Sequence, residues 1–385
     1  MTHPLRDDAM ILLGDLVGFP TVTSESNLDL IEYVFDVLEP HATEIRLTRS
    51  PKEPKANLLA TIGPSTDGGV ILSAHSDVVP ADEIDWTGAP FVAMRREQRI
   101  YGRGTADMKG FLACALATAP WLAGLELKKP VQIAVTFDEE VGCRGAPLLI
   151  DDLCTHGPKP AAAIVGEPTE MGIVTAHKGC YEYTTTITGI EGHGSQPDQG
   201  VNAVQFGARY ISKLLELADV LKERAPENSA YDPPHTTIST GWIQGGSARN
   251  VVAGECVVEW ELRPVNRSDA SWVLESLREY EVALGEQMAP ECAIVTVSEG
   301  EVDGLEDDSG SAAIAMMQDL LETEEVSTVP FGTEAGLYQQ AGIAAVVCGP
   351  GSIDVAHKPD EYVSLDQLEA CLDMMDGLGE KLSKA

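Results

Sequence analysis

The chain has 385 residues, 44% of them hydrophobic, and its 61 acidic against 26 basic residues give a formal charge of −35. Such a charge repels phosphate backbones and anionic lipid surfaces, so it argues against nucleic-acid binding and against membrane-surface binding. The apolar content excludes a disordered chain, and the length exceeds what one hydrophobic core fills, so two domains are expected.

No targeting or membrane segment stands out in the sequence. No stretch reaches the roughly 18 apolar residues of a membrane span, and residues 1–18 lack a basic start followed by an apolar core. The eight cysteines never occur in a C-x-x-C spacing, which in a chain of this length indicates reduced thiols rather than disulfides. We therefore expect a soluble, cytoplasmic protein.

The first part of the chain predicts a sheet covered by helices. Residues 5–38 show helical spacing interrupted at Pro20, and a strand-rich region begins at 57–62. Four apolar runs then end in polar residues that could bind a metal: GGVILSAHSD, VQIAVTFDEE, AAAIVGEPT and AAVVCGPGSIDVAH. Helix-like segments such as 110–122 lie between the runs. This alternation predicts an α/β domain with a mostly parallel sheet flanked by helices, and places the four polar ends at one edge.

We interpret residues 179–290 as an inserted α+β domain. The segments YEYTTTITGI, TTISTGWIQGG and CVVEWELRP alternate like half-exposed strands, and two long amphipathic helices accompany them. The sheet domain would then comprise residues 1–178 and 291–385. We expect it to resume with a strand at 292–297 and to end near 363–384.

Two histidines and three acids are the candidate metal ligands. His75, Glu140, Glu167 and His357 stand at the ends of the four apolar runs, and Asp107 lies in GRGTADMKG, which joins an extended segment to the start of a helix. Each alone has an ordinary explanation, since a histidine can end a strand and an acid can cap a helix. Together they form a set of imidazoles and carboxylates that suits two divalent ions sharing a carboxylate. Acids clustered without cations would keep their protons, so bound metal explains why so many acids gather here.

Two further acids complete the predicted centre. Asp77 stands two residues after His75 and can reach its second ring nitrogen, as carboxylates behind metal-binding histidines commonly do. Glu139 precedes Glu140 in the run DEE, and neighbouring side chains at a strand end point in different directions. Glu140 can therefore bind metal while Glu139 takes a proton from the attacking water. Glu139 is the predicted general acid/base of a hydrolase.

In order and across nearly the whole chain, these segments resemble the motifs of the M20-type dinuclear zinc amidohydrolases and exopeptidases. The matching motifs are HSDVVP, GRGTADMKG, TFDEEVG, GEPT, GHGSQPDQGVNA and AHKPDEY. The resemblance implies a zinc-peptidase-like catalytic domain with two Zn²⁺ per subunit, Co²⁺ being the alternative. Asp107 would bridge the ions, His75 and Glu167 would complete one site, and Glu140 and His357 the other.

The resemblance also implies that the inserted domain is a lid through which the protein forms a homodimer. His193 would reach the active site of the partner subunit and stabilise the oxyanion, with Asn250 nearby. Arg263 and Lys178 would contact the substrate carboxylate, and Thr333 belongs to a loop that takes part in substrate binding.

The expected reaction is hydrolysis of the N-acetyl amide of a small amino acid, foremost N2-acetyl-L-ornithine, to ornithine and acetate in arginine biosynthesis. Succinyl-diaminopimelate desuccinylase, carboxypeptidase, aminoacylase or dipeptidase activity are alternatives, as is a non-catalytic, metal-stabilised dimeric binding protein. A serine hydrolase is disfavoured because the chain contains no G-x-S-x-G. One position departs from the family pattern, since Gly194 follows His193 where a serine is usual.

Overall fold

The computed structural model describes residues 2–308 and 310–384. The chain divides into two compact units. The first comprises the chain up to Ala176, Asp307–Ser327 and the chain from Thr333 onward, and the second comprises His177–Glu306 with Thr328–Gly332. The second unit therefore interrupts the first in sequence.

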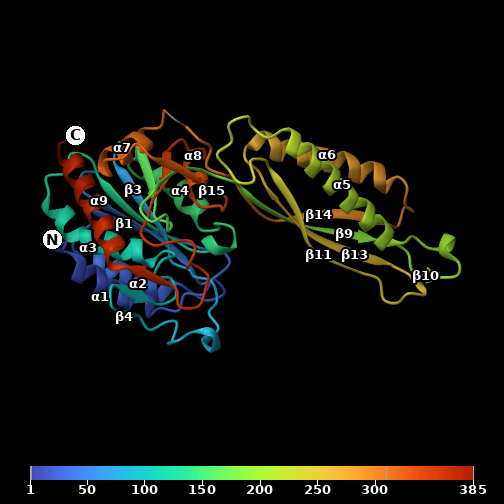
Figure 1. Cartoon of the computed structure of the whole chain (residues 1–385), viewed down its shortest axis with the longest axis horizontal. Coiled ribbons are helices and arrows are strands. Elements are labelled where there is room, and N and C mark those ends of the chain that lie inside the picture. The colour runs from blue at the N-terminus through green and yellow to red at the C-terminus, as the bar shows by residue number, and fades with distance from the viewer. Residues whose placement is uncertain (1, 309, 385) are drawn as a thin grey trace. The chain divides into compact units, whose positions relative to one another are not determined.

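A mixed sheet forms the centre of the first unit, with the strand order β1-β2-β6-β3-β7-β16-β8-β15 (Figure 1). Its strands are β1 (Glu44–Arg49), β2 (Ala56–Ile62), β3 (Val70–His75), β6 (Val131–Thr136), β7 (Ala162–Val165), β8 (Ile173–His177), β15 (Val326–Val329) and β16 (Ala344–Val347). The central strands β6, β3, β7 and β16 run parallel, whereas β2 pairs antiparallel with β6, and β8 pairs antiparallel with β16. The α/β class predicted from the sequence is confirmed.

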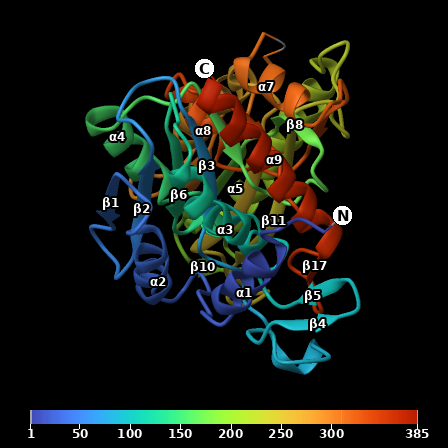
Figure 2. The same cartoon turned by 90° about the vertical axis from the view of Figure 1, so that its left-hand side faces the viewer.

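Helices cover both faces of this sheet, and the central strands β3 and β6 are accordingly buried on both sides. In β3, Leu72 and Ala74 join the core beneath the helices, whereas the hydroxyl oxygen of Ser73 lies 2.9 Å from that of Tyr338, on α8. Figure 2 shows α9, α3 and α1 in front of the sheet strands. The helices sharing the first core are α1 (Arg6–Val17), α2 (Leu28–Leu38), α3 (Lys109–Gly124), α7 (Ala312–Leu320) and α9 (Leu365–Lys384), while α4 (Ala146–His156) contacts α8 (Ala335–Gln340).

A small antiparallel sheet also belongs to the first unit. It has the order β17-β5-β4, formed by β4 (Met94–Arg96), β5 (Arg99–Tyr101) and β17 (Tyr362–Ser364). It brings the segment after Tyr101 beside the segment before Tyr362.

The second unit is an antiparallel sheet with helices on one face (Figure 1). Its strand order is β11-β13-β9-β14, and side chains alternate as expected for such a sheet, so that Tyr183 and Ile187 in β9 are buried while Thr188 is exposed. Asn202 and Asn266 accept main-chain N–H bonds at the starts of the two helices. The elements are β9 (Cys180–Thr188), β11 (Thr237–Gly245), β13 (Glu255–Arg263), β14 (Ala293–Val302), α5 (Ala203–Glu223) and α6 (Arg267–Gly285).

One boundary predicted from the sequence is wrong. The strand expected at 292–297 does not return the chain to the first unit, because β14 pairs with β9 in the sheet of the second unit. The reason is visible in its side chains, since Val295 and Val297 are each 52% exposed, whereas a strand of the covered parallel sheet is buried on both faces. The first unit resumes only at Asp307.

Two other sequence features concern the whole chain. All eight cysteines are free thiols. Among the described residues, the structure contains no helix with the length and apolar content that crossing a membrane requires.

Candidate metal centre

The parallel strands of the first unit deliver polar residues to one edge of the sheet. His75 ends β3, the turn η2 (Glu139–Val141) follows β6, and Glu167 follows β7. The loop after β16 carries His357. Because the carboxyl ends of parallel strands lie at the same edge, residues far apart in the sequence meet there.

The structure brings together the five residues predicted as metal ligands. The Nε2 atom of His75 lies 3.0 Å from Oδ1 of Asp107 and 3.8 Å from Oε1 of Glu167. The Nε2 atom of His357 lies 3.2 Å from Oδ2 of Asp107 and 3.0 Å from Oε2 of Glu140. Asp107 therefore stands between the two imidazoles and directs one carboxylate oxygen toward each.

The residues of this cluster fit divalent metal ions. Within the described part of the chain, the buried Oε1 atom of Glu167 accepts no hydrogen bond, which is costly for a carboxylate unless a cation lies nearby. Ligand atoms of His75, Asp107 and Glu140 lie within 4.8 Å of one another, as do those of His75, Glu139 and Glu167. Imidazole nitrogens mixed with carboxylate oxygens are a donor set typical of zinc.

The pKa values of the side chains in this cluster reflect the negative charge concentrated in it. Burial raises the pKa of Glu139 and of Glu167 well above the ordinary value, and neighbouring carboxylates raise it further. Burial would also raise the pKa of Asp107, but hydrogen bonds from His357 and His75 hold it below its usual range. Hydrogen bonds to Asp107 and Glu140 raise the pKa of His357 to about 10. Without a cation, Glu139 and Glu167 would therefore hold their protons more tightly than free carboxyl groups, as predicted, whereas Asp107 would release its proton more readily.

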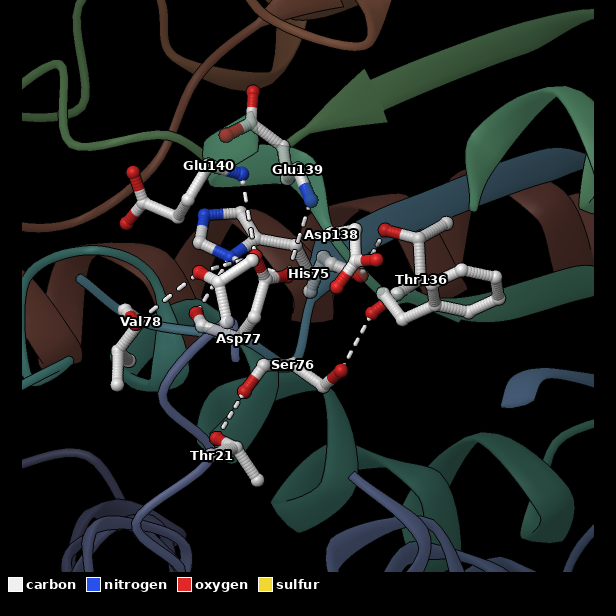
Figure 3. Close-up of polar contacts among 12 residues, drawn as sticks. Thr21, His75, Ser76, Asp77, Val78, Thr136, Asp138, Glu139 and Glu140 are labelled. Atoms are coloured by element: carbon white, nitrogen blue, oxygen red, sulfur yellow. Dashed lines mark hydrogen bonds and ion pairs between the residues drawn. The ribbon is translucent and has the colours of Figure 1, made fainter. Parts of the chain in front are cut away.

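Asp77 does not act on His75 in the predicted way. The Nδ1 atom of His75 donates to the main-chain carbonyl of Asp77 at 2.9 Å, whereas Oδ1 of Asp77 lies 3.7 Å from that nitrogen. The carboxylate instead accepts the main-chain N–H groups of Glu139 and Glu140, at 3.1 and 3.2 Å (Figure 3). These N–H groups begin the turn η2 and need acceptors. Asp77 thus fixes the turn that carries both glutamates.

The first acid of the DEE run has its own partner, which the sequence analysis missed. The Nζ atom of Lys55 lies 2.5 Å from Oδ1 of Asp138 and 2.5 Å from the main-chain oxygen of Thr23, and both charged side chains are buried. Asp138 has φ 57°, a left-handed conformation that turns the chain after β6. The contact joins residues distant in sequence, and no local pattern marks a buried lysine.

His193 and Asn250 lie close together in the second unit. Strand β10 (Gly192–His193) pairs with β12 (Val251–Val252), and Gly194 donates its main-chain N–H to the carbonyl of Asn250 at 2.7 Å. A Cβ atom at Gly194 would lie 2.7 Å from that carbonyl oxygen, so a serine here would require the main chain to shift. The N–H of Ser195 donates to Nδ1 of His193, so a neutral imidazole carries its proton on Nε2.

The remaining predicted substrate contacts have different environments. The guanidinium of Arg263 donates through Nε and Nη2 to Glu261 and is partly exposed. Lys178 is 2% exposed and its ammonium donates to two main-chain carbonyls, those of Pro233 and His235. Thr333 is fully buried, and its hydroxyl oxygen accepts the N–H of Ala335 at the start of α8. Substrate contact by Arg263, Lys178 and Thr333 stays a prediction.

Comparisons with known proteins show what the whole chain resembles. A model of peptidase family M20/M25/M40 matches residues 71–381. An acetylornithine deacetylase of Proteus mirabilis is 35% identical over 387 residues, covering 97% of this chain and 96% of its own. Another, of Myxococcus xanthus, is 36% identical over 368 residues and covers 93% of each chain. These matches confirm the family resemblance drawn from the motifs.

The fold is shared with solved structures as well. The M20 family metallo-carboxypeptidase Sso-CP2 of Sulfolobus solfataricus superposes with a TM-score of 0.76 at 20% identity, covering 98% of this chain and 100% of its own. At that identity the likeness concerns the fold alone.

Proposed function

This chain belongs to peptidase family M20/M25/M40, and on that premise we propose that it is an amidohydrolase that removes the acetyl group of N2-acetyl-L-ornithine. Relatives named acetylornithine deacetylase, about a third identical over nearly the whole chain, support this substrate. The cluster around Asp107 carries the reaction class, since it combines a set of ligand residues with a neighbouring carboxylate that serves as a proton carrier.

Five residues would hold two divalent ions. We assign Asp107 as the bridge, with His75 and Glu167 on one side and Glu140 and His357 on the other. Asp107 directs its two oxygens toward different imidazoles, which supports a carboxylate that both ions would share. When bound, such ions polarise the amide carbonyl and lower the pKa of water at the site.

The protein's own groups would manage the protons. Glu139 takes a proton from the attacking water and returns it to the leaving nitrogen. Its raised pKa, caused by burial, suits a carboxyl that must hold this proton between the two steps. Asp77 keeps Glu139 in place by binding its main-chain N–H, and the Nε2–H of His193 donates to the oxyanion.

The second unit would act as the lid and as the dimer surface. We propose that His193 serves the active site of the partner subunit in a homodimer, with Asn250 at its side, and that Arg263 binds the substrate carboxylate. The exposed valines of β14, a strand at the sheet edge, support a protein interface on this unit. A cytoplasmic location, proposed from the composition, agrees with eight free thiols.

Turnover on a substrate panel tests this proposal. The panel contains N2-acetyl-L-ornithine, succinyl-diaminopimelate, N-acetylmethionine and simple dipeptides, and each is assayed before and after chelation, with metal content measured on the same sample. We expect kcat/KM to be highest for N2-acetyl-L-ornithine and turnover to stop when metal is removed. Preference for another substrate refutes the substrate assignment, and no turnover of any compound favours a binding protein.

A further inference from the structure

Glu361 is a buried acid that the proposed reaction leaves without a role. It stands four residues after His357, and its side chain is completely buried. Its Oε1 atom accepts the main-chain N–H groups of Ala106 and Asp107, at 2.8 and 3.1 Å. One carboxylate oxygen of Glu361 thus binds the main chain of the loop that carries Asp107.

The other oxygen holds the beginning of the same loop. The Oε2 atom of Glu361 accepts from Nη1 of Arg103 at 2.7 Å and from the main-chain N–H of Gly104 at 3.0 Å. The main chain at Gly104 has φ +83°, and a Cβ atom there would lie 2.8 Å from a methyl group of Val78. The loop therefore wraps closely around the carboxylate.

The small sheet of the first unit explains how this contact arises. Tyr101 of β5 pairs with Tyr362 of β17, and the next main-chain N–H, that of Gly102, donates to the carbonyl of Glu361 at 3.0 Å. The loop 102–107 begins where β5 ends, and Glu361 immediately precedes β17. The pairing of these strands delivers the carboxylate into the loop.

The charge of Glu361 is compensated locally. Arg103 is only 3% exposed, and its guanidinium lies 5.2 Å from the ring centre of Trp86. A buried carboxylate that accepts from a guanidinium and three N–H groups is fully satisfied. Its charge is therefore used to hold the loop rather than to bind a ligand.

We propose that Glu361 is a positioning residue that joins the two loops carrying Asp107 and His357, so that both side chains are in place before metal binds. The two loops are therefore joined at two points. The Nε2 atom of His357 lies 3.2 Å from the Asp107 carboxylate, and Glu361, four residues after His357, accepts the main-chain N–H of Asp107. This inference rests on the proposed metal centre. Supporting groups of this kind typically contribute 10- to 100-fold to metal affinity.

The substitution Glu361→Gln tests the proposal. Glutamine keeps the volume, but its NH₂ group cannot accept the bonds that one carboxylate oxygen now accepts. We expect zinc affinity, measured by calorimetry with a competing chelator, to fall about 10- to 100-fold. The rise in Tm on adding zinc should shrink as well, because less binding energy is available to the folded state.

A matched control separates positioning from general stability. Asp269, in the second unit, is a buried carboxylate that also accepts from an arginine, Nε of Arg224 at 3.1 Å, and from the hydroxyl of Thr236 at 2.7 Å. Asp269→Asn should lower Tm with and without zinc alike and leave zinc affinity within about twofold of wild type. Glu361→Asp keeps the charge but shortens the reach, so an intermediate loss of affinity is expected, and this variant decides the matter should Glu361→Gln not fold.

The outcomes are distinguishable. Wild-type protein that binds no zinc overturns the proposed metal centre, and this inference with it. Wild type that binds zinc, with Glu361→Gln or Glu361→Asp binding it equally well, overturns the inference alone. An equal loss of affinity in Asp269→Asn also overturns it, because the effect would then be one of stability.

Discussion

Replacing Glu139 by glutamine is the most direct test of the proposed chemistry. Glutamine preserves the shape of the side chain and the main-chain N–H bond to Asp77 (3.1 Å), so the turn stays in place while the proton carrier is lost. General acid–base catalysis typically contributes 10²- to 10⁴-fold, which corresponds to about 3–5 kcal/mol in activation free energy. We expect kcat for acetate release from N2-acetyl-L-ornithine to fall by this factor.

Metal content is the second measurement, because the geometry allows a rival role. Ligand atoms of Glu139, His75 and Glu167 lie within 4.8 Å of one another, so Glu139 could itself be a ligand. Our assignment expects Glu139→Gln to keep the wild-type metal-to-protein ratio by mass spectrometry. Glu140→Gln is the contrasting variant and should lose metal, since its carboxylate lies 3.0 Å from Nε2 of His357. Loss of an equivalent of metal in Glu139→Gln, or retained activity, refutes the assignment.

Three further predictions concern supporting residues. Asp77→Asn should lower kcat about 10- to 100-fold, since an amide can accept only one of the two N–H groups that the carboxylate holds, at Glu139 and Glu140. Lys55→Met should lower the free energy of unfolding by about 3 kcal/mol, because it leaves the buried Asp138 without a cation, and adding Asp138→Asn should recover part of the loss. Burial lowers the pKa of His177 from 6.5 to about 4, so the unfolded chain binds a proton in this range and the folded chain does not. Stability should therefore fall by about 2 kcal/mol from this group between pH 7 and pH 5, and urea unfolding of metal-free His177→Gln should lack this part of the pH dependence.

The sequence predicts the elements of the site better than their supporting contacts. Apolar runs that end in polar residues predicted the parallel sheet and the meeting of His75, Glu167 and His357, because strand direction alone brings such ends together. Asp107 lies outside these runs, in the loop before α3, and was placed with them by the motif GRGTADMKG. Strand β14 was misassigned because a short alternating run does not reveal which sheet it joins. The bonds from Asp77 to the N–H groups of the glutamate turn left no pattern, since any residue supplies a main-chain N–H. The ion pair of Lys55 with Asp138 left no pattern either, because the two residues are far apart in the sequence.

The spread of the candidate ligands along the chain has a consequence for how the protein matures. His75 ends the third strand, whereas His357 follows β16, beyond the interrupting unit. A ribosome must therefore synthesise the interrupting unit before the last imidazole can join the others. Ion uptake at the complete centre would therefore require that the two segments of the first unit have already come together around the insertion.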